Sequence, residues 1–291
     1  MIKLKIILGK TAGFCYGVKR AVDGAMTETD NNKNIYCLGE IVHNKSVIKE
    51  LEQKGVEFID DINQAKEKVI IRAHGVPKEV YEKAKNSKIE IIDFTCPHVL
   101  KIHKIAEEYS SKGYFIIILG KKTHPEVIGI ESFCGKNKIV IQDEDEVQIA
   151  IKTIENSGIP NIVIIAQTTY NSKKFDKIVN EIKENIDKNI KIEKTICPAT
   201  ETRQKETEEI SKKVDVMIII GDKKSSNTNK LYDIACSNCK KVMFIQNRNE
   251  LNFEEIKNSN KIGIMAGAST PNKDIEEVII FLENGGTIWK K

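Results

Sequence analysis

Three cysteines in this sequence stand at one fixed distance from a glycine that ends an apolar run. In each case the glycine follows its cysteine by 24 residues, and the pairs are Cys15 with Gly39, Cys96 with Gly120, and Cys197 with Gly221. The runs that these glycines end cover residues 35–39, 115–120 and 216–221. Self-similarity along a chain indicates repeated structural units. We therefore expect three copies of one α/β unit, each of which supplies one thiolate to a shared site.

Polar side chains suited to catalysis or anion binding recur after the strand-like runs. Four residues beyond the three glycines stand His43, His124 and Ser225. A second set of apolar runs, at residues 69–71, 162–165 and 262–265, leads to His74, Thr168 and Ser269. Apolar runs that alternate with helical patterns predict parallel βαβ units, whose ligands gather at the carboxyl ends of the strands. The sequence thus predicts an α/β fold of three similar units with small parallel sheets, turned inward around one centre.

Each of the three cysteines lies between a predicted strand and a predicted helix. The strands cover residues 2–8, 89–92 and 190–192, and helical patterns follow the cysteines. Pro97 and Pro198 suit the first position of a helix, because the N–H that proline lacks has no helical partner there. The positive end of a helix dipole favours the charged form of a nearby thiol. The three thiols are therefore candidate metal ligands.

The composition argues against several other classes of protein. The chain has 291 residues, of which 40% are hydrophobic and 30% charged, so it is long enough for two or three packed domains. We place the boundaries at 1–96, 97–195 and 196–291. The net charge of +4 is dispersed, and no basic block with aromatic residues predicts nucleic-acid binding. Without an apolar run of about 18 residues or a signal-like N-terminus, we expect a cytoplasmic protein that binds no membrane. No large heptad or apolar stripe predicts obligate assembly, so we expect a monomer.

Cysteine usage favours metal or redox chemistry over a disulfide framework, because seven is an odd number in a chain of cytosolic character. Three thiolates from separate units could hold zinc or three corners of an iron–sulfur cube. A fully ligated [4Fe–4S] cluster takes four cysteines, so three would leave one iron open as a Lewis acid. Cys37 and Cys134 are interpreted as structural thiols. Cys236 and Cys239 form a lone CxxC, which predicts no zinc site without a second pair.

Three of the five histidines, His43, His74 and His124, follow predicted strands. Together with Ser225, Ser226, Asn227 and Ser269 they resemble an anion cage, in which each charge-assisted hydrogen bond contributes about 1.5–3 kcal/mol. His98 and His103 lie on a predicted helix, where a surface or helix-start role is expected. Glu126 is a candidate proton donor if its pocket raises its pKa, and otherwise a first-turn acid that the helix dipole stabilises.

Seven motifs, in unbroken order from about residue 9 to about residue 275, resemble those of the 4-hydroxy-3-methylbut-2-enyl diphosphate reductases, the terminal enzymes of the non-mevalonate isoprenoid pathway. The motifs are Gly13-Phe14-Cys15-Tyr16-Gly17-Val18, Arg72-Ala73-His74-Gly75, Thr95-Cys96-Pro97, His124-Pro125-Glu126, Gln167-Thr168-Thr169, Ser225-Ser226-Asn227 and Gly267-Ala268-Ser269. Two departures are Tyr16, where alanine or phenylalanine is usual, and Phe94, where alanine is common. Neither is expected to touch the chemistry.

The resemblance implies a three-domain trefoil around one [4Fe–4S] cluster per chain, held by Cys15, Cys96 and Cys197. It implies that the substrate diphosphate is bound by His43, His74, Ser225, Ser226, Asn227 and Ser269. His124, Glu126 and Thr168 would face the substrate's hydroxyl and allyl carbons, with Glu126 as proton donor. The substrate alcohol would lose water and take two electrons, from ferredoxin or flavodoxin, to give isopentenyl and dimethylallyl diphosphate.

Two other functions fit a three-cysteine cluster. One is a redox-neutral [4Fe–4S] dehydratase of the quinolinate-synthase type, which is also built from three repeats with one cysteine each and needs no electron donor. The other is a non-catalytic iron–sulfur sensor, which needs neither an acid nor a phosphate cage. The residues that flank the cysteines favour the reductase.

Overall fold

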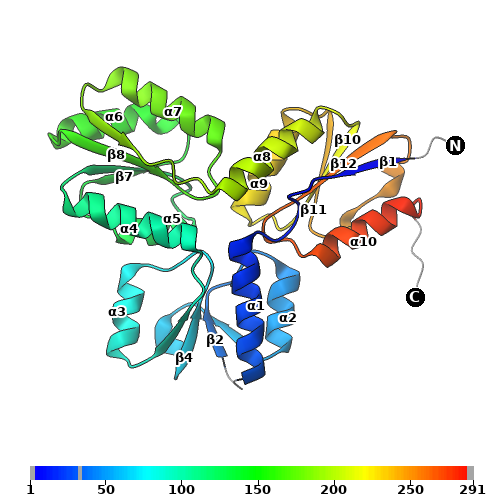
Figure 1. Ribbon diagram of the computed structural model, residues 1–291, viewed down its shortest axis with the longest axis horizontal. Coiled ribbons are helices and arrows are strands. Elements are labelled where there is room, and N and C mark those ends of the chain that lie inside the picture. The colour runs from blue at the N-terminus through cyan, green and yellow to red at the C-terminus, as the bar shows by residue number, and fades with distance from the viewer. Residues whose placement is uncertain (1–3, 32–34, 287–291) are drawn as a thin grey trace. The chain divides into compact units, whose positions relative to one another are not determined.

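Three four-stranded sheets organise the computed structural model, which describes residues 4–31 and 35–286 (Figure 1). Every strand pair is parallel. Sheet A has the order β1 (Lys5–Leu8), β12 (Lys261–Ala266), β10 (Val216–Ile220), β11 (Lys241–Ile245). Sheet B has the order β3 (Val56–Ile59), β2 (Ile35–Leu38), β4 (Lys68–Ile71), β5 (Glu90–Asp93). Sheet C has the order β7 (Lys138–Ile141), β6 (Phe115–Leu119), β8 (Asn161–Ala166), β9 (Asn189–Ile192).

Helices connect the strands in the right order for parallel crossovers. The described helices are α1 (Tyr16–Asn31), α2 (Lys45–Gln53), α3 (Lys78–Asn86), α4 (Pro97–Ser111), α5 (Pro125–Ser132), α6 (Val147–Ser157), α7 (Ser172–Asn185), α8 (Pro198–Ser211), α9 (Ser226–Cys236) and α10 (Asn272–Glu283). Short 3₁₀ turns lie at Ile62–Gln64, Glu144–Glu146, Arg248–Glu250 and Phe253–Glu255. Among the described residues, none of these helices is both long and apolar enough to span a bilayer.

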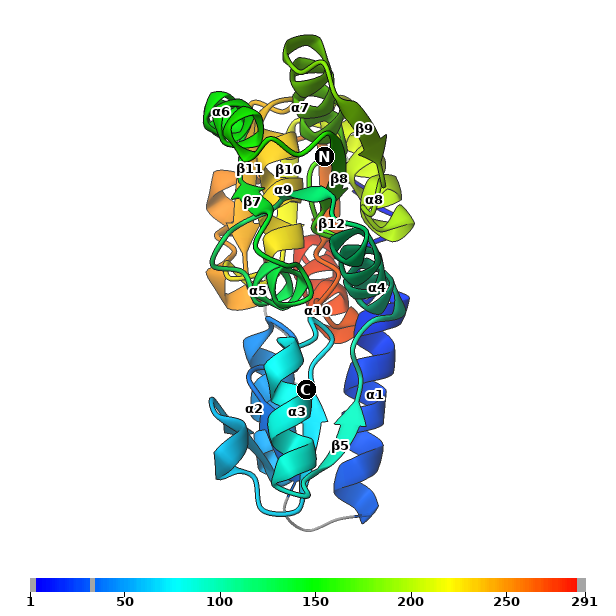
Figure 2. The same cartoon turned by 90° about the vertical axis from the view of Figure 1, so that its left-hand side faces the viewer.

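The central strands are continuous runs of apolar, mostly β-branched residues because helices cover both faces of their sheets. In sheet C, Ile117 and Ile164 pack with α6 and α7 on one face. Their neighbours Ile116 and Val163 pack with α4 and α5 on the other face. Figure 1 shows α6 and α7 on one side of this sheet and α4 and α5 on the other. Figure 2 shows α3 and α1 on either side of β5 in sheet B. Burial on both faces explains why the sequence shows runs here and no alternation.

The three sheets share one strand order, and the N-terminal strand completes the last of them. The edge strand next to the second central strand is β5 in sheet B, β9 in sheet C and β1 in sheet A. We expected the strand at residues 2–8 to belong with residues 1–96, but β1 pairs with β12, with Lys5 opposite Lys261. Residues 2 and 3 of that expected strand lie outside the described residues. The reason for the difference is that strand pairing is non-local, and the described residues after α10 form no fourth strand for the third repeat.

The chain divides into two compact bodies. The A body, which contains sheet A, comprises residues 1–19, 43–48 and 198–291, and the BC body, which contains sheets B and C, comprises residues 20–42 and 49–197. The predicted α/β class with three small parallel sheets is confirmed. The boundaries 1–96, 97–195 and 196–291 stay a prediction, except that β1 belongs to the sheet of the third repeat.

Candidate functional site

The three candidate cysteines occupy equivalent strand-to-helix junctions. Cys15 precedes α1, Cys96 is the N-cap of α4, and Cys197 precedes α8. The backbone N–H of each cysteine donates to a carbonyl at the end of the neighbouring strand. The acceptors are Ala268 for Cys15 at 3.1 Å, Ala73 for Cys96 at 3.0 Å and Thr168 for Cys197 at 3.0 Å. This repeated hydrogen bond confirms that the three junctions are equivalent.

The glycines that revealed the repeat are equivalent too. The N–H groups of Gly39, Gly120 and Gly221 extend the central strands by donating to Ile59 at 2.8 Å, Ile141 at 3.0 Å and Ile245 at 2.9 Å. The carbonyl acceptors all lie at the ends of the edge strands β3, β7 and β11. The fixed spacing in the sequence therefore reflects a fixed length of helix plus strand between each cysteine and the end of its central strand.

The thiols of the three junction cysteines have the chemistry of metal ligands. None of the seven cysteines forms a disulfide, and Cys15, Cys96 and Cys197 are each partly exposed at the start of a helix. Thiolates so placed are suited to binding iron or zinc. By contrast, burial raises the pKa of Cys37 and of Cys134 to about 12, so these thiols stay protonated.

The two cysteines of the CxxC pair lie in different environments. Cys236 is exposed, whereas Cys239 is buried. The Cys239 thiol donates to the carbonyl of Lys241 at 3.3 Å. That this pair forms no zinc site stays a prediction.

Glu126 and Thr168 form a buried pair in the BC body. Glu126, on the first turn of α5, is 2% exposed. The Thr168 N–H donates to one Glu126 oxygen at 2.6 Å, and the Thr168 hydroxyl donates to the other at 2.8 Å. Burial raises the pKa of Glu126 to about 7, against these two hydrogen bonds, which favour the ionised form. Glu126 is therefore poised to hold a proton near neutral pH.

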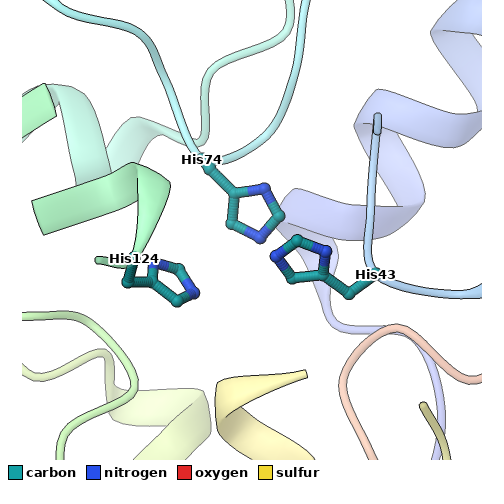
Figure 3. Close-up of side chains that lie close together, drawn as sticks. All are labelled: His43, His74 and His124. Carbon is teal, nitrogen blue, oxygen red and sulfur yellow. The ribbon is translucent and has the colours of Figure 1, made fainter. Parts of the chain in front are cut away.

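His124 is oriented by the helix that it caps. Its Nδ1 accepts the backbone N–H of Glu126 at 3.1 Å, so in the neutral ring the proton resides on Nε2. The His74 ring lies edge-on to the His124 ring, with the ring centroids 5.4 Å apart. Figure 3 labels His74 and His124, and also His43, which belongs to the A body. His124 thus presents an Nε2–H donor beside a second imidazole.

A second group of predicted binding residues gathers in the A body. Ser225 is the N-cap of α9, and Asn227 follows in its first turn. Asn227 is 4% exposed, yet neither its amide oxygen nor its amide nitrogen has a hydrogen-bond partner among the described residues. The Ser269 hydroxyl donates to the backbone carbonyl of His43 at 3.0 Å. A buried amide without partners is costly unless a ligand supplies them, so Asn227 indicates a polar ligand here.

The predicted site residues therefore fall into two groups. His74, His124, Glu126 and Thr168 lie in the BC body, and His43, Ser225, Ser226, Asn227 and Ser269 lie in the A body. In the BC body, hydrogen bonds join Thr168 to Glu126, and the His74 and His124 rings are in contact. In the A body, the Ser269 hydroxyl contacts the backbone of His43. That both groups serve one site stays a prediction.

The surface or helix-start role expected for His103 is wrong. His98 is exposed in the first turn of α4, but His103 is 3% exposed and stacks on Phe133 with 4.4 Å between ring centroids. Within residues 4–31 and 35–286, neither of its ring nitrogens has a hydrogen-bond partner. Its spacing from Val99 places it on the apolar face of the helix, and that signal could have revealed its burial.

Two residues of α8 that were not predicted from the sequence contact the loop before Cys15. They are Arg203, which is 3% exposed, and Glu206. The sequence signal for these residues was only the polar character of this helix. The burial of an arginine is unusual, but the structure alone reveals it.

Comparison with known proteins gives one consistent family. Residues 6–283 match the family described as LytB protein. The 4-hydroxy-3-methylbut-2-enyl diphosphate reductase of Clostridioides difficile (strain 630) is 42% identical over 284 residues, which are 97% of this chain and 100% of that protein.

Two solved structures cover nearly the whole chain. A structure described as (E)-4-hydroxy-3-methyl-but-2-enyl diphosphate reductase, the terminal enzyme of the non-mevalonate pathway, is 37% identical with a TM-score of 0.69 and covers 97% of this chain and 99% of its own. The E-1-hydroxy-2-methyl-but-2-enyl-4-diphosphate reductase from Plasmodium falciparum is 30% identical with a TM-score of 0.87, over 96% of this chain and 88% of its own.

Proposed function

The chain belongs to the LytB protein family, and on that premise we propose that it reduces (E)-4-hydroxy-3-methylbut-2-enyl diphosphate to isopentenyl and dimethylallyl diphosphate. The net reaction removes the substrate hydroxyl as water and consumes two electrons and two protons. An oxidoreductase of this kind needs a proton source, an anion site and a redox group. The residues described above can supply the first two and ligands for the third.

One observation carries the proposal. Thr168 contacts both the candidate proton donor and a candidate cluster ligand, because its N–H and hydroxyl donate to Glu126 while its carbonyl accepts the N–H of Cys197. Proton delivery and electron delivery would thus meet at one residue. Neither a sensor nor a simple electron carrier requires a buried acid at this position.

We propose that Cys15, Cys96 and Cys197 hold one [4Fe–4S] cluster. Bound there, the cluster would supply the electrons and one iron with an open coordination position. The three partly exposed thiols at helix starts support this ligand set. The trefoil arrangement of the three repeats around the cluster is part of the same proposal.

Glu126 would deliver the proton through Thr168. Because burial raises its pKa to about 7, the Glu126 carboxyl can hold a proton near neutral pH. A protonated Glu126 donates to the Thr168 hydroxyl oxygen, which frees the Thr168 hydroxyl hydrogen to pass to the substrate hydroxyl as it departs as water. His124, with its Nε2–H, would orient the same hydroxyl and the allyl carbons.

The diphosphate would be held by His43, His74, Ser225, Ser226, Asn227 and Ser269. The amide of Asn227, unpartnered among the described residues, supports this role, because its N–H₂ group can donate to a phosphate oxygen. Histidine and hydroxyl donors add charge-assisted hydrogen bonds to the same anion. We further propose that ferredoxin or flavodoxin donates the electrons and that the enzyme works in the cytoplasm as a monomer.

Turnover of the substrate by anaerobically prepared holoprotein tests the proposal. With a reduced dye as electron donor, we expect oxidation of the dye that depends on substrate, and formation of both five-carbon diphosphates. A protein with an intact, reducible cluster that gives no product would refute it. Product formation without any reductant would instead support the redox-neutral dehydratase.

A further inference from the structure

The loop that carries Cys15 has no regular structure of its own. It runs from Gly9 at the end of β1 to Phe14, and Cys15 follows directly before α1. The backbone N–H and C=O groups of such a loop need partners from elsewhere. Side chains of α8 provide several of them, although α8 lies almost 200 residues further along the chain.

Glu206 binds the N–H groups at the start of this loop. Its carboxylate accepts the backbone N–H of Lys10 at 2.6 Å, and the N–H and hydroxyl of Thr11 at 2.9 and 2.5 Å. Burial raises the pKa of Glu206, but the hydrogen bonds from Thr11 and Lys10 outweigh it, so the pKa lies below its usual value. Glu206 is therefore a fixed anion that satisfies three donors of one loop.

Arg203, one turn earlier on α8, binds the carbonyls of the same loop. Its Nε and Nη2 donate to the Thr11 carbonyl at 2.8 and 2.5 Å, and Nη2 also donates to the Gly13 carbonyl at 2.9 Å. The planar guanidinium spans two carbonyls that are two residues apart, which fixes the path of the chain between them. Lysine could not reproduce this geometry.

Close packing fixes the end of the loop. Gly13 adopts φ +97°, and a Cβ there would lie 2.8 Å from Oδ1 of Asn272. The N–H of Cys15 donates to Ala268 at 3.1 Å. Arg203 and Glu206 thus form six hydrogen bonds with the loop, and the N–H of Cys15 adds a seventh at its end. Together these bonds hold the segment that carries the Cys15 thiol.

The helix that holds this loop begins immediately after another candidate ligand, because Cys197 is joined by its peptide bond to Pro198, the first residue of α8. We propose that Arg203 and Glu206 are positioning residues that fix the Cys15 thiolate relative to the start of α8, so that Cys15 stays a ligand of the cluster. This inference rests on the proposed function for the identity of the cluster. With only three protein ligands, loss of one from its position should release iron quickly.

Iron release from anaerobically reconstituted holoprotein tests this role. The variants are Arg203→Met and Glu206→Gln, with Thr11→Val as a milder change that removes one hydroxyl donor. Glu208→Gln is the matched control, because Glu208 lies on the same helix and forms an ion pair at 2.7 Å with Lys212, which directly follows the helix. The readouts are the rate of iron transfer to a chelator and the paramagnetic resonance spectrum of the reduced cluster.

We expect iron release from Arg203→Met and Glu206→Gln to be roughly 10–100-fold faster than from the wild type, with a changed spectrum, as for other residues that orient metal ligands. Thr11→Val should show a smaller change of the same sign, Arg203→Lys should recover only part of the loss, and Glu208→Gln should match the wild type. If Arg203→Met does not fold, Thr11→Val and Arg203→Lys carry the comparison.

The outcomes separate this inference from the proposed function. A wild-type protein that takes up no cluster would refute the proposed function itself. A wild type with a cluster, together with variants whose release rate and spectrum are unchanged while the unfolding temperature of the apo-protein falls, would show that Arg203 and Glu206 only stabilise the fold. That result would overturn the positioning role.

Discussion

Glu126 owes its proposed role to its surroundings more than to its identity as an acid. An exposed glutamate is ionised at neutral pH, whereas this carboxyl is 2% exposed and is hydrogen-bonded by Thr168, a neutral residue. Desolvation outweighs those hydrogen bonds and brings its pKa to about 7. A proton donor with a pKa near the working pH is the most effective kind.

Replacing Glu126 by Gln should lower turnover by roughly 10²–10⁴-fold and leave the cluster content unchanged. In the wild type, turnover should fall as the pH rises through about 7, because the carboxyl then loses the proton that it must give, and the variant should lack this decline. The measurement is the pH profile of kcat. Glu131→Gln on the same helix is the control, and near-normal turnover of Glu126→Gln would remove this residue from the mechanism.

His103 should make the stability of the protein depend on pH. Burial lowers the pKa of His103 to about 4 from an ordinary value of 6.5, with Asp93 acting in the opposite direction. Between these values the unfolded chain binds a proton that the folded chain does not, so the stability falls as the pH is lowered from 6.5 to 4. The full difference is on the order of 3 kcal/mol.

Urea unfolding of the apo-protein at several pH values measures this effect. His103→Leu should lose that part of the pH dependence, because leucine cannot bind a proton. His98→Leu, at an exposed position of α4, should keep it. Identical pH dependence in the wild type and His103→Leu would contradict the assignment.

The first turn of helix α9 packs closely against the residues that follow β12 and β10. A Cβ on Gly267, just after β12, would lie 2.0 Å from the Thr228 hydroxyl oxygen, and one on Gly221, just after β10, would lie 2.8 Å from it. Glycine is needed at Gly267 because the first turn of α9 approaches its backbone so closely. This contact fixes the turn that carries Asn227.

Gly267→Ala should therefore destabilise the protein by about 1–3 kcal/mol, as overpacking of a close contact does. The Thr228 hydroxyl has no hydrogen-bond partner in the part of the chain that the structure describes, so Thr228→Ala should relieve the clash, and the double variant should be more stable than Gly267→Ala alone. Denaturant unfolding of the single and double variants measures this coupling. Strict additivity would show that the two residues do not compete for space.

The N-terminal strand β1 completes the third of the three repeated sheets, sheet A. Each sheet ends in an edge strand that leads to a cysteine, and β1 takes this place in sheet A although the other strands of that sheet lie beyond residue 215. The repeat pattern is thus circularly permuted relative to the chain ends. A destabilising substitution in β1 should consequently lower the stability of strands near the C-terminus.

Ile7→Asp should lower the hydrogen-exchange protection of β12 and β10 and leave that of β6 and β8 unchanged, because Ile7 pairs with Gly263 in sheet A. The matched variant Ile190→Asp changes the equivalent edge strand of sheet C, where Ile190 pairs with Ile162, and should produce the reverse pattern. Loss of protection in all three sheets from either variant would contradict this division.

The sequence predicted the strand ends and the cysteine junctions well because the relevant signals are local. Continuous runs such as residues 115–119 can only be buried strands or helices, and the glycine and cysteine spacing selects strands. The partner of β1 could not be predicted, since pairing depends on contacts far apart in sequence. Edge strands such as β7, with a half-exposed start and few residues, also lack a strong pattern.

The positions of the candidate site residues along the fold were predictable, whereas their assembly into one site stays a prediction. Its chemical groups follow strand ends, where the topology of parallel sheets gathers them. Arg203 and Glu206 were not predictable, because their hydrogen bonds run to backbone groups of a loop with no sequence signature. The burial of His103 was not predicted because histidine usually lies at the polar surface. Here its ring stacks on an aromatic ring at the apolar face of the helix.

In the proposed enzyme, three cysteines, one from each repeat, would hold a cluster with one iron open to the substrate. Mössbauer spectroscopy of anaerobic ⁵⁷Fe-labelled protein tests it most directly. We expect one [4Fe–4S] cluster per chain in which a single iron differs from the other three and responds when the diphosphate substrate is added. A protein with four equivalent iron sites, or one that binds zinc and no iron–sulfur cluster, would contradict it.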